Sequence, residues 1–190
     1  MEKLHLMLLA VLLFAGITAA EQDSVILGPY RVSFDLGIPR THYTTEIGGP
    51  ETSESLNGSS MTDYTLDIYT YSGSAKISLD IYDAPSLNLS EKPMEKVLLE
   101  TAKPNAFQGA ITTSAVRQID GTDGAVISID VGGHSGYIAG YQPNINGSNL
   151  VTMMSTIPWD EGTLSLLNTI HVEPAEASAN SSGSSSLTSP

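Results

Sequence analysis

The sequence predicts an α+β domain, namely a mainly antiparallel twisted sheet of six to seven strands with two helices packed on it. Three observations predict this class. Short runs of alternating apolar and polar residues recur along the chain, as in strands with one buried face. Glycine-containing turn sequences separate several of these runs, as in hairpins. Two other segments, near 90–103 and 160–170, repeat apolar residues at helical spacing.

The N-terminal residues have the pattern of a cleavable export signal. Lys3 precedes an apolar run over 6–17, and small residues ending in Ala20 follow it. A run of this length rises only about 18 Å as a helix, which is less than the roughly 30 Å of a hydrocarbon core. We therefore predict a signal peptide over 1–20, no membrane span after its cleavage, and a secreted or cell-envelope location. An uncleaved anchor is the alternative.

Composition limits what the rest of the chain can do. We predict a single domain over 21–172 and a disordered Ser-rich tail over 173–190. The chain has 8 Lys and Arg against 21 Asp and Glu, a net charge of −13. Nucleic-acid binding is not expected, because phosphate contacts need clustered basic side chains. Without cysteine the chain has no disulfides and no thiolate metal sites.

The first strand is expected at 30–36, where four apolar residues alternate with polar ones. Residues 21–28 are interpreted as a short lead-in to it. Residues 37–62 are rich in Gly, Pro, Ser, Thr and Glu and show little periodicity. This composition predicts a long loop, with at most a short strand near 44–47.

A hairpin is expected from the alternating runs 64–71 and 75–82. A two-residue turn at 73–74, with glycine first, would join them. That register aligns the two apolar faces and places Asp67 directly opposite Asp80. Opposed carboxylates need relief by solvent, by salt or by a bound cation. We expect relief by solvent, with calcium binding as the alternative.

The two helical segments each have an N-cap residue and an apolar stripe. Ser90 caps the first helix, over 90–103, and Asp160 caps the second, which ends near 170. The stripes comprise Met94, Val97, Leu98 and Thr101 in the first helix and Leu164, Leu167 and Ile170 in the second. Each stripe predicts that its helix packs on the sheet.

Further strands are expected around these helices. A hairpin over 110–131 turns at 120–124, where Asp-Gly pairs occur. A strand over 137–141 follows two glycines at 132–133, and another strand occupies 150–157.

The strand LVTMMSTI at 150–157 and the helix at 160–170 resemble the end of PsbP-like domains. That superfamily includes photosystem extrinsic subunits, Ran-binding proteins and bacterial lipoproteins. In element order the resemblance covers 29–172, and the loop at 37–62 is a departure. The resemblance implies an antiparallel sheet between helices and a non-catalytic binding or assembly role. No functional residue can be transferred from it.

Few motifs suggest catalysis. Ser135 lies in a Gly-His-Ser-Gly sequence, but Tyr137 stands where a nucleophile elbow needs glycine, and a strand follows. A glycine-rich turn is therefore favoured. The alternative is a hydrolase in which His42 or His171 activates a serine.

Metal and cofactor sites are not expected. The segment 120–124 resembles half of a calcium loop but lacks its distal glutamate, so a plain turn is favoured. His42, His134 and His171 have no metal-ligand spacing.

Four sequons fit N-x-[ST], and each lies in a predicted loop, helix lead-in or tail. The candidate glycosylation sites are Asn57, Asn88, Asn146 and Asn180. Roughly half of such sequons arise by chance in a chain this rich in Asn, Ser and Thr.

The polar face of the 64–82 hairpin mixes tyrosines with carboxylates. Its candidate ligand-binding residues are Asp67, Tyr69, Tyr71, Asp80 and Tyr82. Tyrosines among polar groups can form a ligand platform. The alternative, which we favour, is that a helix covers this face and makes the tyrosines part of the core.

These features predict an exported, acidic, non-catalytic domain that binds a partner protein or a cell-envelope component. A secreted serine hydrolase is one alternative. A cation- or sugar-binding module on the tyrosine-bearing face is the other.

Overall fold

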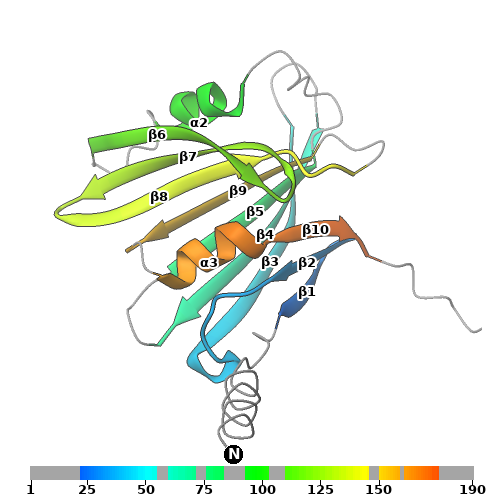
Figure 1. The fold of residues 1–190 in the computed structure, drawn as a ribbon. Helices are drawn as coiled ribbons and strands as arrows, with labels where there is room; N and C mark the ends of the chain where they lie inside the picture. The colour runs from blue at the N-terminus through cyan, green and yellow to red at the C-terminus, as the bar shows by residue number, and fades with distance from the viewer. Residues whose placement is uncertain are drawn as a thin grey trace, which may run out of the picture.

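The computed structural model describes residues 22–54, 60–71, 76–83, 93–102, 110–145, 150–158 and 161–175. These residues form mainly antiparallel strands with two α-helices and a short 3-10 helix, η1 (Arg40–His42) (Figure 1). The predicted mostly antiparallel α+β character is confirmed. The prediction of one sheet is wrong, because the strands form a seven-stranded and a three-stranded sheet.

The large sheet is antiparallel throughout and has the strand order β3-β4-β5-β9-β8-β7-β6. Its strands are β3 (Tyr43–Glu54), β4 (Ser60–Thr70), β5 (Lys76–Asp83), β6 (Ala110–Ile119), β7 (Thr122–Val131), β8 (His134–Tyr141) and β9 (Leu150–Ile157). The strands β3 and β6 form its two edges.

The small sheet joins the two ends of the domain. It consists of β1 (Asp23–Leu27), β2 (Tyr30–Phe34) and β10 (His171–Pro174), with β2 in the middle. The lead-in predicted at 21–28 is therefore largely a strand. The first two residues of the tail predicted at 173–190 belong to β10, which continues to Pro174, and residues 176–190 lie outside the described residues. After it, the Ala175 N–H donates to the Pro29 carbonyl at 2.8 Å.

The loop predicted at 37–62 is wrong over most of its length, because β3 occupies 43–54 and β4 begins at Ser60. As an edge strand, β3 has mostly exposed residues on both sides, so its sequence has no apolar alternation. The strand also shifts register between Gly48 and Glu51. Gly49 fits there because its φ is +85° and a Cβ would lie 2.7 Å from the Asp63 carbonyl oxygen.

Both predicted helices are present but shorter. They are α2 (Met94–Ala102) and α3 (Glu161–Thr169), and the proposed caps Ser90 and Asp160 lie outside the described residues. In and just after α3, the buried apolar residues are Leu166, Leu167 and Ile170, whereas Leu164 is only half-buried.

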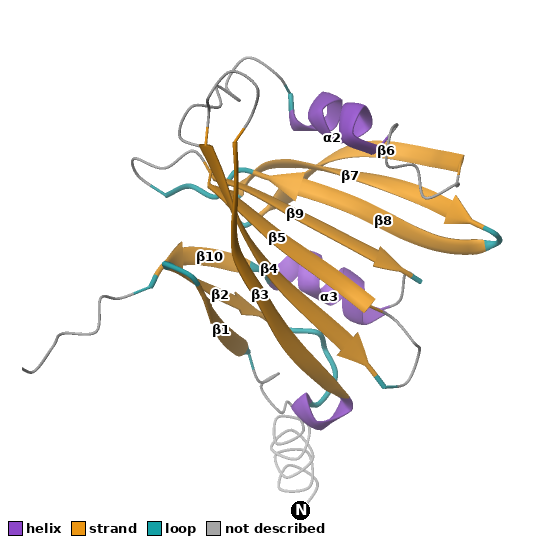
Figure 2. Cartoon of the chain, turned by 180° about the vertical axis from the view of Figure 1, so that it is seen from behind, coloured by secondary structure: helices purple, strands orange, loops and turns teal. Residues whose placement is uncertain are grey.

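The two helices pack on opposite faces of the large sheet. Leu98 of α2 packs with Ala125, Ile127 and Ile129 of β7. The intervening Val126 belongs instead to the larger cluster that contains Leu167 of α3. Because side chains alternate across a strand, α2 and α3 lie on different sides. Figure 2, seen from behind, shows α3 beyond β4, β5 and β9.

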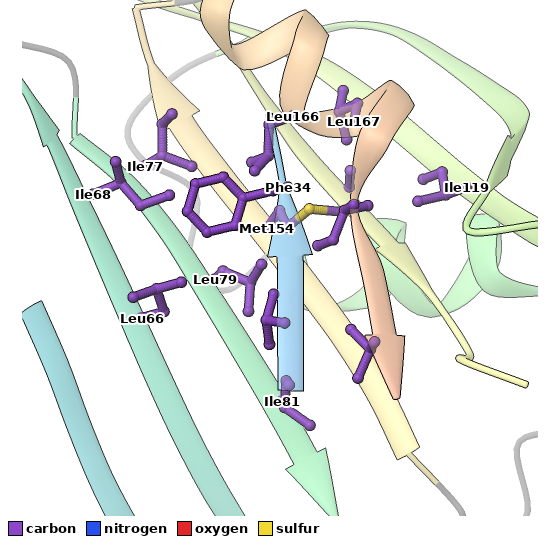
Figure 3. Packing of buried hydrophobic residues seen from close by; sticks show 14 of the residues in the cluster. Phe34, Leu66, Ile68, Ile77, Leu79, Ile81, Ile119, Met154, Leu166 and Leu167 are labelled. Carbon is purple, nitrogen blue, oxygen red and sulfur yellow. The ribbon is translucent and has the colours of Figure 1, made fainter. Parts of the chain in front are cut away.

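The larger core lies between the large sheet, the small sheet and α3. Phe34 of β2 is at its centre, with Met154 of β9 and Leu166 of α3 beside it (Figure 3). Leu66, Ile68, Ile77, Leu79 and Ile81 supply its floor from β4 and β5. The apolar side of the predicted 64–82 hairpin is therefore core.

Two hairpin turns have both central residues at positive φ, as in type I′ turns. They are Asp120 with Gly121, at +52° and +70°, and Gly132 with Gly133, at +60° and +83°. The predicted 120–124 turn is thus only two residues long, and β7 starts at Thr122. Ser135 lies within β8, so the favoured turn is confined to 132–133.

The predicted register of β4 and β5 is wrong by two residues. Leu66 pairs with Leu79 and Thr65 with Asp80, so paired residue numbers sum to 145 instead of 147. A two-residue shift keeps every side chain on its face, so apolar alternation cannot exclude it. Polar pairing favours the observed register, because Asp67 faces Ser78 and is not opposite Asp80.

Candidate functional site

The face of β4 and β5 that points away from the larger core carries most of the predicted ligand-binding residues. We call it the tyrosine–carboxylate face; its residues are Asp63, Thr65, Asp67, Tyr69, Lys76, Ser78, Asp80 and Tyr82. Except for the exposed Lys76, all of these residues are half-buried.

Among the described elements, no helix covers this face. The contacts of α2 are with β6, β7 and β8, so it lies on the same side of the sheet but over the other half. The favoured interpretation, in which a helix makes these tyrosines part of the core, is therefore wrong for the described helices. Tyr71, just beyond β4, is 66% exposed, and its N–H donates to the His42 carbonyl at 3.0 Å.

One end of the tyrosine–carboxylate face is electrostatically paired. The Lys76 ammonium lies 2.8 Å from Asp67 Oδ2 and 5.7 Å from the centroid of the Tyr69 ring. The Ser78 hydroxyl donates to Asp67 Oδ1 at 2.5 Å, and the Tyr69 hydroxyl is 3.4 Å from Oδ2. The hydrogen bond to Asp67 is the main cause that raises the pKa of Lys76. The Asp67 carboxylate and the Tyr69 ring therefore hold the Lys76 ammonium between them.

The other end has carboxylates without a cation in contact among the described residues. Asp80 accepts a hydrogen bond from the Thr65 hydroxyl at 3.1 Å. Burial raises the pKa of Asp80, and the charge of Asp67 adds to the increase, whereas the Thr65 bond and Lys76 oppose it. Desolvation and negative neighbours make the charged form costly here.

Asp63 is a second carboxylate at this end of the face and lies closer to the β3 edge of the sheet. It pairs in register with Tyr82 on one side and Glu51 on the other. Burial raises the pKa of Asp63 to about 6, and the charges of Asp80 and Glu51 add to the increase. Its Oδ1 is buried and has no hydrogen-bond partner among the described residues. Burial, followed by the charges of Asp80 and Asp63, also raises the pKa of Tyr82, which keeps its hydroxyl protonated.

The opposed pair of Asp67 and Asp80 does not exist in the observed register, so the argument for a calcium site on that pair fails. Within the described residues, no group of three or more His, Asp or Glu side chains could hold a metal ion. What this face offers is a row of acceptors and aromatic rings, suited to cations or to hydroxyl groups.

The structure does not bring Ser135 together with either candidate histidine. Ser135 pairs with Asp130 near one end of β7, whereas His171 contacts Asp120 at the opposite end. Eight residues of strand, about 26 Å, separate these ends. His42 precedes β3, four strand spacings or about 19 Å from β8. A triad of these residues is therefore not formed.

Asp120 has a role that the sequence analysis missed. Its carboxylate accepts from the Val172 N–H at 3.1 Å and the Tyr141 hydroxyl at 3.3 Å, and its Oδ1 lies 2.6 Å from His171 Nδ1. It therefore fixes β10 of the small sheet to the large sheet. The Asp-Gly signal predicted the turn, but these partners lie 21 to 52 residues away in sequence.

The candidate glycosylation sites Asn57, Asn88, Asn146 and Asn180 all lie outside the described residues, as does the signal peptide at 1–20. In the part of the chain that is described, no helix is long and apolar enough to cross a membrane.

A scan against protein-family models, a search of curated proteins and a search of solved structures each found no match.

Proposed function

We propose that this protein is an exported, non-catalytic domain that binds a cationic segment of a partner through its tyrosine–carboxylate face. One observation carries the proposal. Asp63 on β4 and Asp80 on β5 are diagonal neighbours, with Tyr82 directly opposite Asp63 and Thr65 directly opposite Asp80; both carboxylates are half-buried and have no cation in contact among the described residues. Negative charge held in this way is relieved by an incoming cation.

The chemistry of such binding has an internal example four residues along β5. There, Lys76 is held between the carboxylate of Asp67 and the ring of Tyr69. Asp80 and Tyr82 repeat this combination of carboxylate and tyrosine without an ammonium group. A lysine or arginine of an extended partner segment would complete the second group in the way Lys76 completes the first.

The rest of the molecule is consistent with such a partner. A net charge of −13 attracts basic segments over long range and repels nucleic acid. That the protein is exported is inferred from the predicted signal peptide at 1–20 alone. The resemblance to PsbP-like domains stays a prediction, and a non-catalytic binding role agrees with what it implies.

The alternative ligand for this face is a sugar, because carboxylates accept hydrogen bonds from hydroxyl groups and tyrosine rings stack on sugars. The cation is favoured, because hydroxyl groups would leave the charges of Asp63 and Asp80 uncompensated.

Amide chemical-shift mapping of the exported protein distinguishes these ligands. A lysine–glycine repeat peptide is expected to shift amides of β4 and β5, above all near Asp80 and Tyr82. A glutamate–glycine repeat peptide is the matched control and should shift none. Shifts located elsewhere, or shifts of β4 and β5 with cellohexaose and not with the basic peptide, would reject the proposal.

A further inference from the structure

The two edges of the large sheet differ in how they are protected against pairing with another strand. The β3 edge carries Glu46, Glu51 and Glu54, contains Pro50, and shifts register between Gly48 and Glu51. Charges, proline and bulges are the features by which proteins block edge pairing. The β3 edge is therefore protected.

The β6 edge has little of this protection. Its sequence is AITTSAVRQI, with no acidic residue, no proline and one charge, Arg117. Val116 is 64% exposed and Ile111 41% exposed, and both lie on the α2 side of the sheet. Its one irregularity lies near its start, between Ile111 and Thr113. No described strand pairs with its outer side.

We infer that β6 is a dimerisation edge, on which the β6 strand of a second copy pairs antiparallel to make a continuous sheet. A two-fold axis through Ala115, near the middle of the strand, gives nearly full overlap. In that register Ala115 faces its own copy, Val116 faces Ser114, and Arg117 faces Thr113. In this register no two charged side chains lie opposite each other, because Arg117 is the only charged residue of β6.

Other occupants of the edge fit less well. Pairing of β6 with β3 of another copy would propagate as an open filament, and the features of β3 oppose it. The C-terminal segment 176–190 of the chain itself is rich in Ser and contains Gly and Pro, which are poor strand formers. A symmetric pair of β6 strands closes after two copies. Because one strand pair buries less than a standard interface, we expect a Kd on the order of 10 μM.

Charge-swap variants at Ala115 test this interface. Ala115 is exposed, so Ala115→Glu and Ala115→Lys should fold, as a melting curve will verify. In the dimer each variant would place two like charges directly opposite. Sedimentation equilibrium should therefore show a dimer for the wild type, monomers for each variant alone, and recovery of the dimer in their equimolar mixture. Ile47→Glu, on the protected edge, is the matched control and should leave the dimer intact.

A second variant tests the register. The chain has no cysteine, so Ala115→Cys introduces a single thiol. Opposite residues in a pair of antiparallel strands lie about 4.5–5.5 Å apart, within reach of a disulfide. Rapid oxidation to a covalent dimer is expected for Ala115→Cys and not for Ile47→Cys. A wild type that stays monomeric at several hundred micromolar, no recovery on mixing the charged variants, or association abolished by Ile47→Glu would each overturn the inference.

Discussion

The Lys76 ammonium lies 2.8 Å from the Asp67 carboxylate, so the cation of the tyrosine–carboxylate face is already engaged at one end. At the other end, burial and neighbouring negative charges make the ionised forms of Asp80 and Asp63 unfavourable. This asymmetry is the basis of the proposed function and of three of the predictions that follow.

Removing the cation should strengthen binding of a basic peptide. Lys76→Met frees Asp67 and lowers the net charge by one, so the Kd is expected to fall by about two- to threefold. Fluorescence anisotropy with the lysine–glycine peptide measures this. The free energy of unfolding should change by less than about 1 kcal/mol, because the Lys76 side chain is exposed and solvent screens its charge. Weaker binding would mean that Lys76 itself contacts the ligand.

Asp63→Asn should stabilise the protein in a pH-dependent way. The pKa of Asp63 in the folded state, about 6, is above its ordinary value of 3.8. The folded state therefore holds the proton more tightly, and stability falls as the pH rises from about 4 through 6. The variant removes this cost. We expect a gain of about 1–2 kcal/mol at pH 7.5, reduced from the full linkage value by solvent screening.

Thermal melts of wild type and Asp63→Asn between pH 4 and pH 8 provide the measurement. The difference in melting temperature should be close to zero at pH 4 and reach a few degrees at pH 7.5. An equal difference at both pH values would show that the effect does not come from ionisation of Asp63.

Leu167→Ala should destabilise the domain by roughly 2–5 kcal/mol, the range for emptying a buried leucine site. Leu167 is fully buried against the larger core (Figure 3). Leu164 was predicted in the same stripe but is only half-buried, so Leu164→Ala is the internal control, with an expected loss below about 1.5 kcal/mol. Urea unfolding compares the two. Equal losses would mean that α3 is rotated from the orientation described.

Substitution of Asp120 should lower the free energy of unfolding more than substitution of an ordinary turn residue. Asp120→Ala leaves the Val172 N–H and the Tyr141 hydroxyl without their acceptor, and it places alanine at a φ of +52°. We expect a loss of about 2–4 kcal/mol in urea unfolding. Asp120→Gly relieves the backbone strain and keeps the loss of the acceptor. If Asp120→Gly restored full stability, the carboxylate would have no part in joining the sheets.

Much of the fold follows from patterns that act within a few residues. Apolar alternation predicted the strands at 64–82 and 150–157, and helical spacing predicted both helices. The sequence could not predict β3, because an exposed edge strand needs no apolar face. The separation into two sheets was equally hidden, because β10 joins β2 across more than 130 residues.

The same apolar alternation predicted part of the candidate site. Alternation correctly placed Asp67, Tyr69, Asp80 and Tyr82 on one side of the hairpin. It missed Asp63 because the predicted strand began one residue later, at Tyr64. It also misplaced Asp80 relative to Asp67, because a shift of two residues preserves the faces. Extending the alternation from Thr65 back to Asp63 is the signal that would have found the third carboxylate.

The central claim is that Asp63 and Asp80 bind the partner's cation, and not merely that the protein is acidic. Asp63→Asn/Asp80→Asn removes both charges from the tyrosine–carboxylate face. Asp130→Asn/Glu173→Gln removes the same charge elsewhere: Asp130 lies on the opposite face of the large sheet, and Glu173 lies in the small sheet. With the lysine–glycine peptide at physiological salt, fluorescence anisotropy should show a Kd at least about tenfold higher for the first variant and less than about twofold higher for the second. Equal weakening by both variants would contradict the account, because it would show attraction by net charge alone.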